Sequence, residues 1–182
     1  MRLEHEAGVL RTLGGTGELP RFGRDVDIVY LIQPFVPGES LETRLAGGPL
    51  LLTDALVAIV DVLRTVETAH ERGVLHRDIK PANVVVDPAT PLRWAVLVDF
   101  GLARSGRLDE SLREQAVGTA RYMAPEQAGL LDVPVDERAD LYSIGVLLFV
   151  CLAGRPPFAG PSVGEVLRQH LSATPPELRG LG

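Results

Sequence analysis

The chain has 182 residues, of which 46% are hydrophobic and 23% are charged. These proportions predict one globular domain and exclude a mostly disordered chain. The formal net charge of −6 argues against a general nucleic-acid or anionic-membrane binder, because such proteins need positive charge on their surface. A single cysteine, Cys151, excludes an intrachain disulfide framework.

The amino terminus is charged, and no apolar run follows it, so it does not resemble a secretory signal. The longest uncharged stretch, residues 141–154, has 14 residues, whereas a membrane-spanning helix needs about 20. We therefore expect a cytoplasmic protein with no membrane segment in this chain and no nucleic-acid partner.

The first half of the chain contains three predicted elements. Apolar residues at helical spacing predict a short helix over residues 6–13. A β-branched apolar run predicts a buried strand over residues 28–32, which Pro34 ends. Thr53 has the character of an N-cap, and apolar residues recur at helical spacing until Gly73, which predicts a helix of nearly twenty residues.

The second half begins with two short apolar runs, residues 84–86 and 95–98, separated by turn residues, and these predict a β-hairpin. Residues 101–124 are polar and lack periodicity, which predicts a long loop. An apolar helix is predicted over residues 140–153, and a shorter helix over residues 163–171.

Three short motifs occur in order along the chain. Residues 76–83 are His-Arg-Asp-Ile-Lys-Pro-Ala-Asn, between the long helix and the hairpin. Residues 99–101 are Asp-Phe-Gly, at the end of the second hairpin strand, and residues 124–126 are Ala-Pro-Glu. Arginine supplies 17 of the 18 basic residues, and the only lysine, Lys80, lies within the first motif.

The side chains in these motifs suit phosphoryl transfer, although each of them taken singly suits a cap or a turn. An aspartate on a loop, here Asp78, can accept the proton of an attacking hydroxyl. The amide oxygen of Asn83 and the carboxylate of Asp99 are hard ligands of the kind that Mg²⁺ prefers. Lys80 follows Asp78 by two residues and can reach a transferred phosphate. The four residues supply each role once.

The three motifs together resemble the signature of the eukaryotic-type serine/threonine protein kinases, with Ile79 in place of a leucine. The resemblance implies an α+β protein-kinase-like fold, mostly the helical C-lobe with the C-helix and the last strands of the N-lobe. Residues 1–38 correspond to a partial N-lobe that ends in the hinge. Residues 39–182 correspond to the C-lobe without its final helices.

This resemblance implies particular roles at the reaction centre. Asp78 is the expected catalytic base, and Lys80 is the expected phosphate contact. Asn83 and Asp99 are the expected Mg²⁺ ligands, beside a bound ATP. A lysine two residues after the base is typical of serine/threonine kinases, so the expected partner is a protein with a serine or threonine hydroxyl.

The resemblance also implies a nucleotide pocket and a set of supporting residues. The hinge would bind adenine through the Pro34 carbonyl and the Val36 amide, with Gln33 as gatekeeper and Val85 below the ring. Glu6 matches the C-helix glutamate. Leu10 and His76 would line up with Phe100 in the packed spine between the lobes. The remaining implied regulatory and structural residues are Arg77, Phe100, Gly101, Thr119, Glu126 and Asp140.

Part of the kinase pattern is missing. A kinase domain opens with a Gly-rich loop and a lysine on its third strand, and Lys80 cannot be that lysine. We therefore expect a chain truncated at both ends that transfers phosphate poorly or not at all by itself, with further domains encoded beside it. A non-catalytic, pseudokinase-like binding module is the alternative. A small-molecule kinase related to antibiotic phosphotransferases is a third interpretation, against which the Ala-Pro-Glu motif argues.

Overall fold

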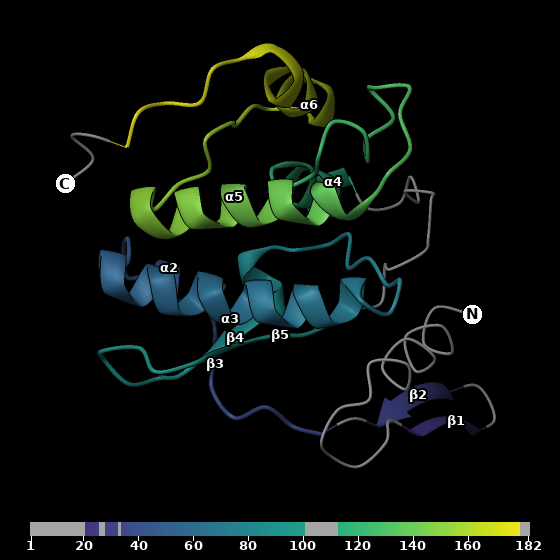
Figure 1. Cartoon of the computed structure of the whole chain (residues 1–182), viewed down its shortest axis with the longest axis vertical. Helices are drawn as coiled ribbons and strands as arrows, with labels where there is room; N and C mark the ends of the chain where they lie inside the picture. Colours follow the sequence, from purple (N-terminus) through teal and green to yellow (C-terminus); the bar gives the residue numbers. More distant parts are fainter. Residues whose placement is uncertain (1–20, 26–27, 33, 101–112, 179–182) are drawn as a thin grey trace.

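The structure is a computed structural model that describes residues 21–25, 28–32, 34–100 and 113–178. Three helices, α6, α5 and α3, lie in successive layers above a small sheet formed by β3, β4 and β5 (Figure 1). The predicted helix over residues 6–13 lies outside the described residues, as do Glu6, Leu10, Gln33 and Gly101.

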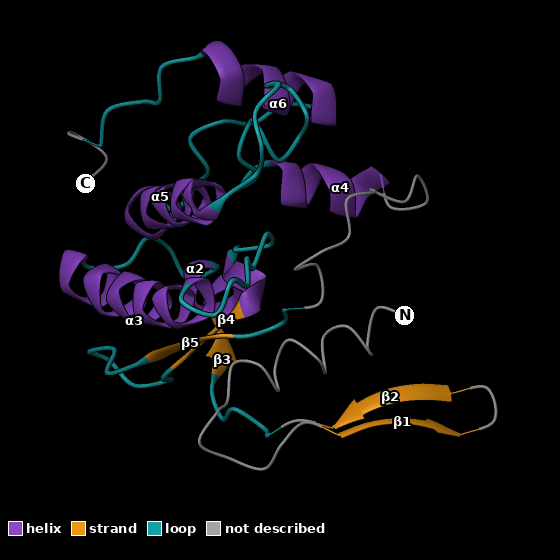
Figure 2. Ribbon diagram, turned by 45° about the vertical axis from the view of Figure 1, so that its right-hand side comes forward, coloured by secondary structure: helices purple, strands orange, loops and turns teal. Residues whose placement is uncertain are grey.

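A separate hairpin precedes this layered body. Its strands are β1 (Arg21–Asp25) and β2 (Ile28–Ile32), paired antiparallel. The prediction of a strand over residues 28–32 is confirmed, but the prediction that it is buried is wrong at Tyr30 and Ile32, which are 42% and 55% exposed. Strand β1 was not predicted because three of its five residues are charged and its sequence shows no apolar run. Figure 2 shows that this hairpin stands apart from the sheet of β3, β4 and β5.

The second sheet contains the predicted hairpin. Its strands are β4 (Val84–Val86) and β5 (Ala95–Leu97), paired antiparallel with Val84 opposite Leu97. Strand β3 (Glu39–Ser40) pairs antiparallel with the other edge of β4, and its two residues are too few to leave a sequence pattern. This pairing holds the segment that follows residues 34–38 against the β4–β5 hairpin.

Helix α2 (Leu41–Leu45) begins at Ser40, whose hydroxyl accepts a hydrogen bond from the Thr43 amide. Helix α3 follows as Leu52–His70. The prediction of Thr53 as its N-cap is wrong, because Leu51 occupies that position without a side-chain hydrogen bond.

Asp54, in the first turn of α3, is buried. Its carboxylate accepts a hydrogen bond from the Leu92 amide at 3.2 Å. The carboxylate therefore fixes a loop against α3.

Helix α5 (Glu137–Ala153) starts three residues earlier than predicted, because Asp136 accepts the Arg138 amide and caps it. It ends at Gly154, whose φ of 66° is the left-handed conformation that glycine adopts without strain. Helix α6 (Val163–Ser172) is capped by Ser162 and confirms the prediction of a helix in this region.

The predicted loop over residues 101–124 is wrong for its second part, because helix α4 (Arg113–Ala120) lies there. Its sequence has no apolar stripe that would indicate a helix. Helix α4 packs against α6, and Ala120 at its end is buried. Contacts with distant parts of the chain therefore favour this helix more than its local sequence does.

The core lies between α3, α5 and the sheet of β3, β4 and β5. Its fully buried side chains include Val62 and Val66 of α3 and Leu147 and Cys151 of α5. Burial raises the pKa of Cys151 to about 12, so this cysteine is a neutral core residue. Within the part of the chain that the structure describes, no helix has the length and apolar character needed to cross a membrane.

We expect Leu147→Ala to lower the free energy of unfolding by about 2–5 kcal/mol, because it removes buried methyl groups and leaves a cavity. Urea unfolding followed by circular dichroism measures this change. Leu141→Ala on the same helix is the control, since Leu141 is 49% exposed and should cost less than about 1 kcal/mol. Equal losses in the two variants would contradict the proposed core.

Candidate active site

The loop of residues 76–83 is fixed by one carboxylate from α5. Asp140 is 1% exposed, and its two oxygens accept the backbone amides of His76 at 2.9 Å and Arg77 at 2.8 Å. The Nε2 atom of His70 lies 2.8 Å from the same carboxylate. Asp140, Ser143 and Leu147 are three and four residues apart, so one helix face both packs into the core and holds the loop.

Two residues of the site have left-handed backbone conformations. The φ angle is 65° at Arg77 and 64° at Asp99, values that cost energy for residues other than glycine. The amide of Arg77 donates to Asp140, and its carbonyl accepts from the Gln127 side chain. These bonds offset the cost at Arg77 and fix the direction in which the loop leaves it.

A cluster of polar side chains surrounds Asp78. This aspartate is 6% exposed, and the Lys80 Nζ atom donates to its carboxylate oxygens at 3.0 and 2.8 Å. The Asn83 amide nitrogen donates to the Asp78 carbonyl at 2.8 Å and to its carboxylate at 3.0 Å. Lys80 also reaches the Thr119 hydroxyl at 3.4 Å. Four residues of the sequence prediction therefore contact one another.

The segment that carries Asp99 lies beside this cluster. The Val98 amide donates to the Asn83 carbonyl at 2.8 Å, and the Val98 carbonyl lies 3.2 Å from His76 Nε2. The rings of His76 and Phe100 have centroids 4.5 Å apart. These contacts flank Asp99 on both sides and bring it to the same end of the hairpin as Asn83.

His76 is neutral in this arrangement. It is fully buried, and burial lowers its pKa below the usual 6.5, although nearby carboxylates, Asp140 foremost, oppose the shift. A neutral ring with its proton on Nε2 donates to the Val98 carbonyl and leaves Nδ1 to accept the Asp78 amide, at 3.3 Å. The ring therefore links the loop of Asp78 to the segment before Asp99.

The predicted adenine-binding residues lie on the segment between β2 and β3 and on β4. Pro34 is exposed, whereas Val36 and Val85 are half-buried. Gly38 lies two residues after Val36 in the sequence. A Cβ atom at Gly38 would lie 2.4 Å from the Val86 carbonyl oxygen and 2.9 Å from Val85 Cγ1. Glycine at this position therefore allows the segment to pass directly over the strand that carries Val85.

The segment after α4 is anchored on α5. The Ser143 hydroxyl donates to the Tyr122 carbonyl at 2.7 Å. Glu126 is half-buried near the start of α5, where its charge adds to the effect of burial in raising the pKa of Tyr142. The sequence did not identify Ser143, Gln127 or His70 as residues of the site. Only Ser143 could have been found, because it lies three residues after Asp140 and so on the same face of the helix.

The side chains at this end of the hairpin fit Mg²⁺. Both hydrogens of the Asn83 amide are directed to Asp78, which leaves its amide oxygen as the atom for a cation. Asp99 supplies a carboxylate at the same end of the hairpin. Among the described residues, no three His, Cys, Asp or Glu side chains converge into a metal-binding group. An amide and a carboxylate suit Mg²⁺, which usually takes one or two protein oxygens and completes its shell with phosphate and water.

Comparison with known proteins identifies the family. The model of the protein kinase domain matches residues 18–176. The chain belongs to this family. It is 39% identical over 158 residues to the serine/threonine-protein kinase pkn2 of Myxococcus xanthus, covering 85% of this chain and 19% of that protein. It is 35% identical over 150 residues to the serine/threonine-protein kinase PknB of Mycobacterium tuberculosis, covering 80% of this chain and 23% of that protein.

A solved structure supports the kinase-like α+β fold. The crystal structure of the Rad53 kinase domain and SCD2 in complex with AMPPNP superposes with a TM-score of 0.68 at 24% identity, and the match covers 92% of this chain and 60% of that chain. The prediction of a protein-kinase-like fold is therefore confirmed. The chain spans only about a fifth to a quarter of the length of the curated relatives it matches.

We expect Asp140→Ala to destabilise the chain, because it leaves two backbone amides in the interior without an acceptor, at about 1–3 kcal/mol each. Asp140→Asn keeps one acceptor oxygen and should lose about half as much. Urea unfolding of both variants measures the difference. A change below 1 kcal/mol in the alanine variant would show that the loop does not depend on this carboxylate.

Stability should also fall with pH below the usual pKa of histidine. The unfolded His76 binds a proton near pH 6.5, whereas the folded side chain binds it only at lower pH. Its contribution is therefore complete above pH 6.5 and decreases as the pH falls, by up to about 1.4 kcal/mol per pH unit. Urea unfolding at pH 7 and pH 5.5 measures this. His76→Gln should flatten the dependence, and an unchanged slope would contradict the assignment.

Proposed function

We propose that this chain is the catalytic portion of a cytoplasmic serine/threonine protein kinase that transfers the γ-phosphate of ATP to a protein hydroxyl. The observation that carries the proposal is that hydrogen bonds link Asp78, Lys80, Asn83 and Thr119 in one cluster. The two neighbours of Asp99, Val98 and Phe100, contact the same loop. Residues 1–38 supply the partial N-lobe and hinge, and residues 39–182 supply the C-lobe.

The side chains divide the work of phosphoryl transfer. Asp78 accepts the proton of the attacking serine or threonine hydroxyl, and the adjacent Lys80 ammonium stabilises negative charge on the phosphate that moves. Thr119, which contacts Lys80, lies where the hydroxyl-bearing substrate would approach. Pro34, Val36 and Val85 would hold the adenine ring.

Mg²⁺ would be held by the Asn83 amide oxygen and the Asp99 carboxylate. When bound, the cation neutralises the charge on the ATP phosphates. Because the Asn83 carbonyl accepts the Val98 amide, the two ligand-bearing segments keep a fixed separation. The protein supplies this preorganisation before nucleotide arrives.

A second function, a non-catalytic binding module, is favoured by one observation. Lys80 is the only lysine among 182 residues, and it is engaged with Asp78, so this chain offers no second lysine to hold the ATP phosphates. Loss of one preorganised charge typically lowers a rate by about 10²–10³. Weak transfer by the chain alone is thus compatible with the kinase proposal, whereas failure to bind Mg²⁺ and ATP is not.

Thermal unfolding with ATP, with and without Mg²⁺, separates the two functions. We expect ATP at about one hundred times its Kd to stabilise the chain by about 2.7 kcal/mol, and only when Mg²⁺ is present. Asp99→Asn should remove the Mg²⁺-dependent part. If ATP does not stabilise the chain, or stabilises it equally with and without Mg²⁺, the kinase proposal is refuted and the binding module is favoured.

A radiolabelled ATP assay with a serine- and threonine-rich protein substrate completes the test. We expect slow transfer that Asp78→Asn abolishes, because the variant loses the proton acceptor but keeps its shape. Robust turnover sensitive to Asp78→Asn would refute the expectation of weak activity. Turnover that survives the substitution would refute the role of Asp78.

A further inference from the structure

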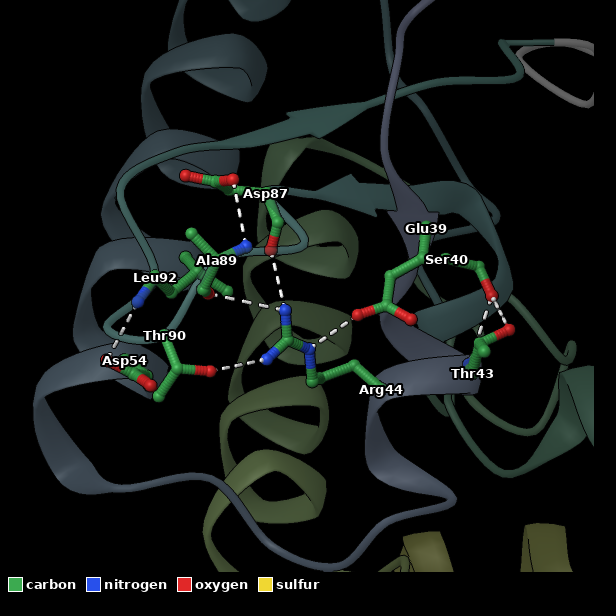
Figure 3. A network of polar contacts seen from close by, with 9 residues as sticks. All are labelled: Glu39, Ser40, Thr43, Arg44, Asp54, Asp87, Ala89, Thr90 and Leu92. Atoms are coloured by element: carbon green, nitrogen blue, oxygen red, sulfur yellow. Dashed lines mark hydrogen bonds and ion pairs between the residues drawn. The ribbon is translucent and has the colours of Figure 1, made fainter.

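Arg44 of α2 joins its own segment to a turn, residues 87–90, that is distant in sequence. Its Nε atom donates to Glu39 at 2.7 Å, and one terminal nitrogen donates to the Thr90 hydroxyl at 3.1 Å. The other terminal nitrogen donates to the carbonyls of Asp87 at 2.7 Å and Ala89 at 3.4 Å (Figure 3). The side chain is 18% exposed; its bonds to Glu39, Asp87 and Ala89 are partly buried, whereas the bond to Thr90 is exposed. Charge-assisted bonds of this kind are roughly twice as strong as neutral ones.

The turn that Arg44 holds is the far end of the hairpin that carries both candidate Mg²⁺ ligands. Asn83 directly precedes β4, and Asp99 follows β5 by two residues. The Val98 amide bonds the Asn83 carbonyl at one end of the hairpin, and the Asp87 amide bonds the Trp94 carbonyl at the other. At about 3.3 Å per residue, the length of β4 separates Arg44's contacts from Asn83.

Besides the pairing of β4 with β3 and β5, different side chains support the two arms of the hairpin. Two carboxylates of α3 hold the second arm, since Asp54 accepts the Leu92 amide at 3.2 Å and Asp61 accepts the Ala95 amide at 3.0 Å. Arg44 holds the first arm through the Asp87 carbonyl. Loss of Arg44 would therefore remove one support of the arm that carries Asn83 and leave its pairing with β3 and β5, while the two carboxylates of α3 still hold the arm of Asp99.

We propose that Arg44 is a positioning residue, which sets the placement of Asn83 relative to Asp99 through the β4–β5 hairpin. The proposal rests on the proposed function for its consequence, namely Mg²⁺ binding, but the mechanical coupling stands on the contacts alone. Arg44 is more than 35 residues from both ligands in sequence and touches neither.

Arg93 provides a matched control. It also bonds Asp87, but at the carboxylate, and it extends from the turn itself with a side chain that is 70% exposed. Arg93→Met removes a guanidinium beside Asp87 without releasing the turn from α2. Arg44→Lys keeps the charge of Arg44 and can make only some of its bonds, so it serves as the conservative variant.

Hydrogen exchange of the backbone amides tests the coupling without any activity. In Arg44→Met we expect the Val98 amide, which bonds Asn83, to exchange about tenfold faster, with the amides of α3 unchanged. Arg44→Lys should fall between this variant and the wild type, and Arg93→Met should stay within about twofold of the wild type. Unchanged exchange at Val98 in Arg44→Met, or equal acceleration in Arg93→Met, overturns the proposal. If Arg44→Met fails to fold, the same comparison between Arg44→Lys and Arg93→Met decides it.

A Mg²⁺ titration of the binding of a fluorescent ATP analogue tests the consequence. We expect the Mg²⁺ midpoint to rise about tenfold in Arg44→Met, whereas binding at saturating Mg²⁺ changes by less than about twofold, because the adenine contacts are intact. Equal midpoints in Arg44→Met and Arg93→Met overturn the role in metal placement. A wild-type chain that binds no nucleotide refutes the proposed function, and the exchange experiment then still decides the coupling.

Discussion

The site depends on one buried carboxylate that accepts the backbone of a loop. Asp140 holds two consecutive amides, and the loop they belong to contains Asp78, Lys80 and Asn83. Because α5 also packs into the core, the position of the loop is set by helix packing. The left-handed turn at Arg77 is tolerated because these bonds offset its energetic cost. The direction of the loop therefore depends on the hydrogen bonds that Asp140 of α5 accepts.

The same principle recurs in the rest of the chain. Asp54 and Asp61 of α3 each accept one backbone amide from the arm that leads to Asp99. Arg44 of α2 supplies the complementary case, a cation that donates to backbone carbonyls of the other arm. Rigid helices thus hold irregular segments through charged side chains directed at peptide groups, which are strong hydrogen-bonding partners. A site built from loops gains its precision in this way.

Sequence patterns predicted the features that residues close together in the sequence determine. The strands of the β4–β5 hairpin are apolar runs bounded by turn residues, and the motif of residues 76–83 carries its chemistry within eight positions. Helix α4 was missed because its sequence has no apolar face and its position depends on α6. The contacts of Arg44 join residues more than forty positions apart, for which a single sequence contains no signal.

The rarity of lysine has a practical consequence for chemical labelling. The chain carries a single ε-amine, and it lies in the candidate active site, on a side chain that is 25% exposed and bonded to a carboxylate. A reagent that acylates primary amines therefore has one side-chain target in the whole polypeptide. The extent of labelling at that position reports how accessible Lys80 is in the candidate active site, with no engineered tag.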